Sequence, residues 1–207
     1  MIKKKDFIEI DFTGIIKETG QVFDTTFKEK AKQIGIEKVK PIRICVGEGM
    51  LVKGFDEAIE GKEIGKNYSI ELEPKKAFGQ RNPNLVKLIP VAVFHRQRID
   101  PYPGQVLNMD GMIARISSVS GGRVITDFNN PLAGKTIVYE FRINKIIEEK
   151  TEQAKAIVEF FIGDVQSKIE GNKIIVEIDK KMRFDKNPIE KKLKDLVGMD
   201  LEIAYKK

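Results

Sequence analysis

Apolar and polar residues alternate over several short stretches of the chain, a pattern typical of half-buried β-strands. In the first third these stretches are residues 7–12, 15–17, 21–24, 42–46 and 67–73. We expect the first to end at Thr13-Gly14, and a hairpin turn at Glu18-Thr19-Gly20 to join the second to the third. Residues 28–40 are polar and lysine-rich, and predict a solvated loop or bulge before the strand at 42–46. The pattern favours an antiparallel sheet.

Residues 51–61 have the spacing of a helix instead. One side of this stretch is apolar and consists of Leu51, Val52, Phe55, Ala58 and Ile59. Because so short a helix is unstable alone in water, its apolar side must pack against other elements. Gly54, in the middle, costs the helix about 1 kcal/mol relative to alanine. We therefore expect the backbone of a strand, or a ligand, to approach the helix closely at Gly54.

Composition changes abruptly in the middle of the chain. Glutamate is absent from residues 84–128, although it is common on either side. Short β-patterns at 105–107, 112–116 and 124–126, with a turn at Gly121-Gly122, predict a small β-rich module there. The strong alternation at 136–143 fits the first domain better. We therefore expect 84–128 to be an insertion into a domain formed by residues 1–83 and 129–150.

Residues 151–207 predict a compact α/β domain. A helical pattern starts at 151, alternation at 173–178 and 201–205 indicates strands, and a helix is expected from Asn187-Pro188 to Gly198. A domain under 60 residues has little core of its own, so a partner can be needed to complete it. We expect a homodimer through this domain, with contacts drawn from Phe160, Phe161, Ile174 or Val176. The whole chain is of the α+β class.

Charge and composition limit the classes of function. The net charge is +6, with acidic and basic residues interspersed, which argues against a nucleic-acid partner. Apolar runs are too short for a membrane span, and the N-terminus has no signal-peptide pattern. One cysteine excludes an internal disulfide. We therefore expect a cytoplasmic protein without a membrane or nucleic-acid partner.

Reactive side chains are scarce. The single histidine, His95, and the single cysteine, Cys45, fall in different predicted domains, so no catalytic triad can be built. Metal-ligand spacing and a phosphate-binding glycine loop are also missing, so we expect neither a metal nor a cofactor. What remains is a set of apolar and aromatic residues at strand ends and on the central helix, with one carboxylate, Asp24.

Five stretches make this set specific. They read Thr-Gly at 13–14, Val-Phe-Asp-Thr-Thr at 22–26, Val-Gly-Glu-Gly-Met-Leu-Val-Lys-Gly-Phe-Asp-Glu-Ala-Ile at 46–59, Ala-Phe-Gly at 77–79 and Asn-Pro-Leu-Ala-Gly-Lys at 130–135. In order and type they resemble the FKBP-type peptidyl-prolyl isomerases. The inserted module resembles the insert-in-flap domain of the SlyD-like branch, and the C-terminal domain resembles the long archaeal form.

The resemblance implies an antiparallel half-barrel sheet wrapped over a short helix, with an apolar cavity between them. Carried over by position, the catalytic residues are Asp24, Phe23, Val52, Phe55, Phe78 and Tyr139, with Phe55 as the cavity floor. Further substrate contacts are implied for Phe12, Leu51 and Leu132. The family usually has Trp at the floor and Tyr where Phe12 and Phe78 stand, so affinity for its macrolide ligands is not implied.

The expected partners are unfolded or proline-containing polypeptides. A dry apolar cavity favours the twisted amide, which is less charge-separated than the planar one, and needs no covalent step. Asp24 could orient groups near the substrate carbonyl, or be only a structural carboxylate at a strand end. In the insert, we expect Ile89, Val93 and Phe94 to be partly exposed and to hold unfolded segments. The alternative function is a non-catalytic holdase chaperone.

Overall fold

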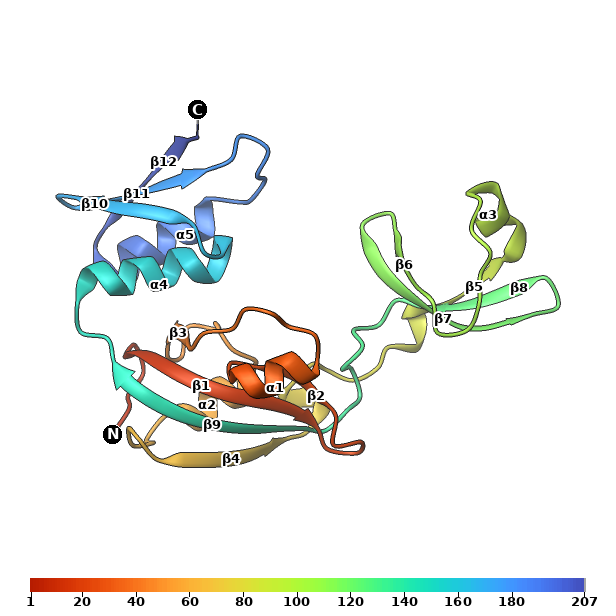
Figure 1. Cartoon of the computed structure of the whole chain (residues 1–207), viewed down its shortest axis with the longest axis horizontal. Helices are drawn as coiled ribbons and strands as arrows, with labels where there is room; N and C mark the ends of the chain where they lie inside the picture. The colour runs from red at the N-terminus through yellow and green to blue at the C-terminus, as the bar shows by residue number, and fades with distance from the viewer. Residues whose placement is uncertain (207) are drawn as a thin grey trace. The chain divides into compact units, whose positions relative to one another are not determined.

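The structure is a computed structural model, which describes residues 1–206 (Figure 1). It is a mixed α+β fold with mainly antiparallel sheets and few helices. The chain divides into two compact units. The first unit comprises Met1–Ala77 and Thr136–Lys207, and the second unit comprises Phe78–Lys135. The predicted insert, residues 84–128, lies inside the second unit.

The main sheet of the first unit contains the strands β1 (Phe7–Ile16), β2 (Val22–Thr25), β3 (Ile42–Cys45), β4 (Asn67–Leu72) and β9 (Ile137–Ile146). All its pairs are antiparallel, in the order β2-β1-β9-β4, and β3 pairs with the first half of β1. The expected strand end at Thr13-Gly14 is wrong. The strand β1 continues to Ile16. A bulge between Gly14 and Ile15 shifts the register of its pairing with β2 and lets the strand continue past Gly14.

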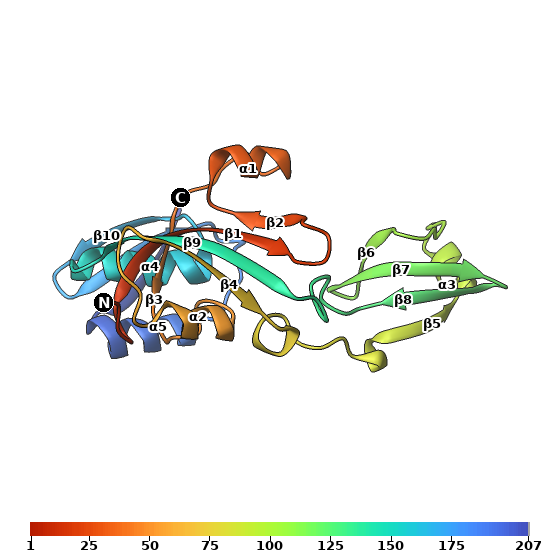
Figure 2. The same ribbon diagram turned by 90° about the horizontal axis from the view of Figure 1, so that it is seen from below.

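Two short helices flank this sheet. Figure 2 shows α2 (Lys53–Ile59) and α1 (Lys28–Gln33) on opposite faces of it. A close approach at Gly54 is confirmed, but not by the backbone of a strand or by a ligand as expected: a Cβ there would lie 2.8 Å from Leu72 Cδ2 and 2.9 Å from the Lys76 carbonyl oxygen. A 3₁₀ turn at Pro74–Lys76 brings that carbonyl to the helix. The loop expected over residues 28–40 is wrong in its first half, which forms α1 around the buried side chain of Ala31.

The second unit is a small β-sheet with one helix. It contains a 3₁₀ turn (Pro83–Leu85), β5 (Val86–Pro90), α3 (Val91–Arg96), β6 (Val106–Met109), β7 (Met112–Ser120) and β8 (Arg123–Asp127). The sheet order is β5-β8-β7-β6. The sequence predicts β6, β7 and β8 but not β5 or α3, because the apolar run from Leu88 to Phe94 has neither a clear strand nor a clear helix period.

The core of the second unit corrects one prediction. Phe94 is only 1% exposed and forms this core with Ile116 and Val124. Its expected exposure is therefore wrong, since α3 turns the ring onto the sheet. Ile89 packs against the same cluster and, like Val93, stays partly exposed.

The C-terminal region, residues 150–206, contains α4 (Lys150–Ile162), β10 (Gln166–Glu170), β11 (Lys173–Ile178), α5 (Asn187–Lys192), a π-helical turn (Leu193–Val197) and β12 (Asp200–Tyr205). The central strand, β11, pairs antiparallel with β10 and parallel with β12. Gly198 ends the second helix in the left-handed conformation, as expected. Figure 1 shows α4 and α5 on one face of this sheet.

Burial in the C-terminal region bears on the expected dimer contacts. Ile174 and Val176 are fully buried in β11, so the expectation that they form a dimer surface is wrong. Phe160, by contrast, is 44% exposed and meets Phe161 edge-on. No helix in residues 1–206 has both the length and the apolar composition required to cross a membrane.

Candidate active site

An aromatic cluster lies between α2 and the main sheet, with Phe55 at its centre. The Phe55 ring stacks on Tyr139 of β9, with 4.3 Å between ring centroids. It meets Phe12 of β1 and Phe141 of β9 edge-on, at 6.1 and 5.0 Å. Phe55 is 1% exposed, so it closes the bottom of the cluster. The sequence expectation that Phe55, Tyr139 and Phe12 lie together agrees with this geometry.

Phe23 and Asp24 lie on the more exposed side of the cluster. The half-buried Phe23 ring meets Tyr139 edge-on at 6.0 Å. Asp24 pairs with Gly14 across β2 and β1, and Gly14 pairs with Tyr139 across β1 and β9. A Cβ on Gly14 would lie only 2.4 Å from Phe23 Cζ. The missing side chain at Gly14 therefore provides the space that the Phe23 ring occupies.

Threonine side chains fix the end of β2 beside this cluster. The Phe12 N–H donates to Thr26 Oγ1 at 3.0 Å, and the Thr26 N–H donates to the Phe12 carbonyl at 3.0 Å. The Thr13 and Thr25 hydroxyls share a hydrogen bond of 3.0 Å. Both Thr25 and Thr26 are buried. They hold the strand immediately after Phe23 and Asp24, which explains why the motif at 22–26 needs two threonines.

The electrostatics of the cluster centre on one carboxylate. Partial removal of the Asp24 carboxyl group from water raises its pKa, although a backbone hydrogen bond with Thr25 opposes this shift. Burial, and then the charge of Asp24, raise the pKa of the Tyr139 phenol, which therefore stays neutral. The cluster thus presents neutral aromatic rings with a single ionisable group at its edge.

A reactive nucleophile is not part of this arrangement. Cys45 is buried, and burial followed by the charge of Glu48 raises the pKa of its thiol to about 12. His95 belongs to the second unit. Within residues 1–206, His, Cys, Asp and Glu side chains form no group of three or more that could hold a metal ion.

A turn at residues 46–49 leads into α2 and carries two further predicted site residues. Val52 is the N-cap of α2, and its carbonyl accepts hydrogen bonds from the N–H groups of Phe55 (2.9 Å) and Asp56 (3.0 Å). Leu51 lines a hollow of about 380 Å³ that also includes Val46 and Gly47. Val52 is therefore tied directly to the helix that carries Phe55, whereas Leu51 borders the turn itself.

The remaining predicted residues lie in the second unit. Phe78 and Leu132 belong to it, as do Ile89, Val93 and Phe94, so a contribution of Phe78 and Leu132 to the site stays a prediction.

Sequence reasoning missed Phe141 and Tyr68, whose rings lie 5.4 Å apart and extend the aromatic cluster. Phe141 stands two residues after Tyr139 on the same strand, and this spacing puts both on one face.

Fold and cluster together define a small antiparallel-sheet domain with a buried aromatic cluster between α2 and the sheet, whose more exposed members are Phe23 and Asp24. A family model described as FKBP-type peptidyl-prolyl cis-trans isomerase matches residues 1–94. A second model, described as FKBP26, IF domain, matches residues 87–132.

Curated relatives agree with these matches. The chain is 32% identical over 156 residues to the short-type peptidyl-prolyl cis-trans isomerase of Methanocaldococcus jannaschii, covering 73% of this chain and 98% of that protein. It is 28% identical over 148 residues to the isomerase SlyD of Aeromonas hydrophila, covering 70% and 65%. It is 28% identical over 141 residues to the FKBP-type 16 kDa isomerase of Escherichia coli K12, covering 64% and 89%.

The chain therefore belongs to the FKBP-type peptidyl-prolyl cis-trans isomerase family. It is an enzyme of this class, with SlyD among its relatives.

Proposed function

We propose that the aromatic cluster around Tyr139, with Asp24 at its edge, is the isomerase site, and that the second unit holds unfolded segments as a chaperone module. The observation that supports the first part is the meeting of three distant segments. Phe23, Phe55 and Tyr139 come from β2, α2 and β9, and the rings of Phe23 and Phe55 both contact Tyr139. Proline-containing polypeptides are the substrates.

Rotation about an X-Pro bond suits such a surface. The barrier is about 18–20 kcal/mol, because rotation breaks the resonance of the amide. The twisted amide is less charge-separated than the planar one, so aromatic walls that exclude water favour it over the ground state. Bringing a step of tens of seconds into milliseconds requires about 5–6 kcal/mol of such preference. Binding and orientation supply this energy without a proton transfer or a covalent intermediate.

Asp24 orients the substrate in this scheme. Asp24 is aligned with Tyr139 across the sheet, because both residues pair with Gly14 of β1, and it lies at the edge of the cluster. We expect Asp24→Ala to lower kcat/KM on a proline tetrapeptide several-fold. Glu140→Gln is the matched control, because Glu140 is exposed on β9 next to Tyr139 but on the opposite face. If Asp24→Ala and Glu140→Gln both keep the wild-type rate, Asp24 is only a structural carboxylate.

The chaperone role is supported by exposed apolar residues on the sheet of the second unit. Leu88 and Ile125 are cross-strand partners on β5 and β8, and they are 57% and 38% exposed. Ile113 on β7 is 57% exposed. Leu88 and Ile125 are neighbours across two strands, and exposed apolar side chains on a sheet bind other chains without sequence preference. In the proposed role of holding unfolded segments, Leu88, Ile113 and Ile125 take the place of Phe94, which is buried.

Substitution of this patch tests the chaperone role separately from catalysis. Leu88→Ser, Ile113→Ser and Ile125→Ser combined should leave tetrapeptide turnover unchanged and sharply slow the catalysed refolding of a proline-limited protein. Replacement of an exposed polar residue of the same unit, Lys87→Ser, is the control. Equal loss in both assays would show that the patch only supports the fold. A wild-type chain that slows aggregation without turning over peptide would instead be a holdase.

The C-terminal region extends this proposal to a homodimer of the long archaeal form. The supporting observation is the exposed ring of Phe160 on α4. Phe160→Glu should convert a dimer into a monomer in sedimentation at micromolar concentration, and a monomeric wild-type chain rejects the idea. A cytoplasmic location completes the proposal, supported by a single cysteine that is free and buried.

A further inference from the structure

The turn that leads into α2 is held in place from the inside by one buried carboxylate. Asp56 of α2 accepts hydrogen bonds from the N–H groups of Gly47 (2.8 Å) and Gly49 (3.1 Å), one on each carboxylate oxygen. Both glycines have positive φ, so the turn adopts a shape that other residues tolerate poorly. Asp56 therefore fixes both sides of the turn but leaves the residue between the glycines, Glu48, to other partners.

Glu48 is held from the outside by the C-terminal region. The Lys192 ammonium donates to the Glu48 carbonyl at 2.9 Å and to its carboxylate at 2.7 Å. Both side chains are 24% exposed, so water screens the contact less than an ordinary surface ion pair. The two residues are 144 positions apart in the sequence. Lys192 thus clamps one residue of the turn through its main chain and its side chain together.

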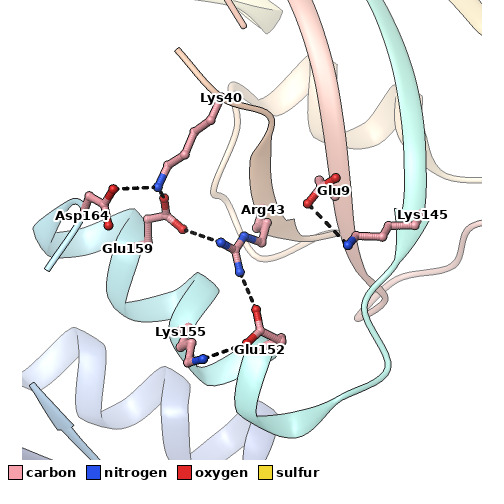
Figure 3. A network of polar contacts seen from close by, with 8 residues as sticks. All are labelled: Glu9, Lys40, Arg43, Lys145, Glu152, Lys155, Glu159 and Asp164. Atoms are coloured by element: carbon pink, nitrogen blue, oxygen red, sulfur yellow. Dashed lines mark hydrogen bonds and ion pairs between the residues drawn. The ribbon is translucent and has the colours of Figure 1, made fainter. Parts of the chain in front are cut away.

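The base of Lys192 is rigid enough for such a clamp. Lys192 is the last residue of α5, between the fully buried side chains of Ile189 and Leu193. A second contact, drawn in Figure 3, fixes the C-terminal region on β3 and the segment before it. Arg43 of β3 pairs with Glu152 at 2.7 Å, and further pairs join Lys40 to Glu159 and Asp164. The C-terminal region therefore contacts the segment before β3, β3 itself and the turn that follows it.

We propose that Lys192 is a positioning residue of the isomerase site, which acts through Glu48 on the turn and on Val52 behind it. This inference rests on the proposed function, in which Phe55 belongs to the isomerase site, and the Val52 carbonyl accepts the Phe55 N–H at 2.9 Å. Without the ammonium, the Glu48 carbonyl and carboxylate turn to water, and the turn is left with its bonds to Asp56 and the backbone hydrogen bonds of Val46 and Glu48. Because a displaced Phe55 weakens contact with the substrate before and during rotation alike, the loss falls mainly on KM and much less on kcat.

The decisive variant is Lys192→Met, which keeps most of the aliphatic chain and removes the charge. We expect its KM for a proline tetrapeptide to rise about three- to tenfold, because a small displacement of the site weakens substrate binding in the ground state and in the transition state alike. Lys191→Met is the matched control, since Lys191 is the exposed neighbour on the same helix. Lys192→Arg, which keeps the cation and its donors, should recover most of the affinity.

A second readout keeps the clamp testable apart from catalysis. The backbone amide NMR signals of Leu51 and Val52 should shift in Lys192→Met and stay in place in Lys191→Met. These signals report on the turn even if the wild-type chain turns over no peptide, which would defeat the proposed function alone. Should Lys192→Met fold poorly, Glu48→Gln weakens the carboxylate half of the clamp and should shift the same signals. The inference would be overturned if Lys192→Met left both the Leu51 and Val52 signals and the KM unchanged. It would also be overturned if Lys191→Met changed them as much as Lys192→Met.

Discussion

Gly14 lies under the Phe23 ring, and replacing it with alanine tests whether that ring's position governs catalysis. Gly14 does not have the positive φ that would strain alanine, so the backbone accepts the change. The new Cβ would lie 2.4 Å from Phe23 Cζ and 2.9 Å from both Cε atoms. Ordinary contact begins at 3.4 Å, so the ring must move by about 1 Å. The move changes its contact with Tyr139.

Stability and activity should respond differently to Gly14→Ala. Alanine in a strand interior gains about 0.5–1 kcal/mol over glycine, and this gain offsets part of the cost of moving a half-buried ring. The free energy of unfolding should therefore stay within about 1 kcal/mol of wild type in urea titrations. A displacement of about 1 Å in a binding group is expected to lower kcat/KM on a proline tetrapeptide about tenfold or more.

A double-mutant cycle with Phe23→Leu isolates the cause. Leucine has no atom at the Cζ position, so Gly14→Ala should do little further harm in that background. An unchanged kcat/KM in the single variant Gly14→Ala would refute the placement of Phe23 in the site. If Gly14→Ala lowers kcat/KM equally with and without Phe23→Leu, the loss of activity does not depend on the position of the Phe23 ring.

Three further expectations follow from the same structure. Gly54→Ala should lower the free energy of unfolding in urea by about 1–2 kcal/mol. The clash with the Lys76 carbonyl outweighs the gain in helix propensity, which is about 1 kcal/mol. A variant more stable than wild type would contradict the close approach. Phe94→Ala should lose about 3–5 kcal/mol in the second unit and speed hydrogen exchange there, and unaltered exchange would contradict the burial of the ring. Folding raises the pKa of Asp24, so its ionised form is disfavoured. Asp24→Asn should therefore gain stability relative to wild type as the pH rises from below about 3.9 through that raised pKa, and a relative loss reverses the sign.

Periodicity and glycine placement predicted most of the sheet and the central helix. The apolar side of residues 51–61 and the cost of Gly54 indicated a helix close to a strand backbone or a ligand, and the close neighbour is the Lys76 carbonyl of a 3₁₀ turn. The segment from Leu88 to Phe94 was harder, because a continuous apolar run fits a buried strand and a helix equally. Phe94 is buried by α3, a helix too short to leave a periodic signal.

In the site, too, local sequence patterns predicted some residues, whereas contacts between residues far apart in the sequence were not predictable. Phe23, Phe55 and Tyr139 could be placed together by their motifs, and alternation alone would have added Phe141. The contact between Lys192 and Glu48 left no trace in either local pattern, since both look like ordinary surface charges. Contacts of this sequence separation depend on how the C-terminal region packs, which periodicity does not encode.

Isomerase kinetics in H₂O and D₂O test the central claim most directly. The wild-type chain should turn over a proline tetrapeptide with the same kcat/KM in both solvents, because rotation on the aromatic cluster moves no proton. A kcat/KM lower by about twofold or more in D₂O would reveal rate-limiting proton transfer and contradict a site that works by binding alone.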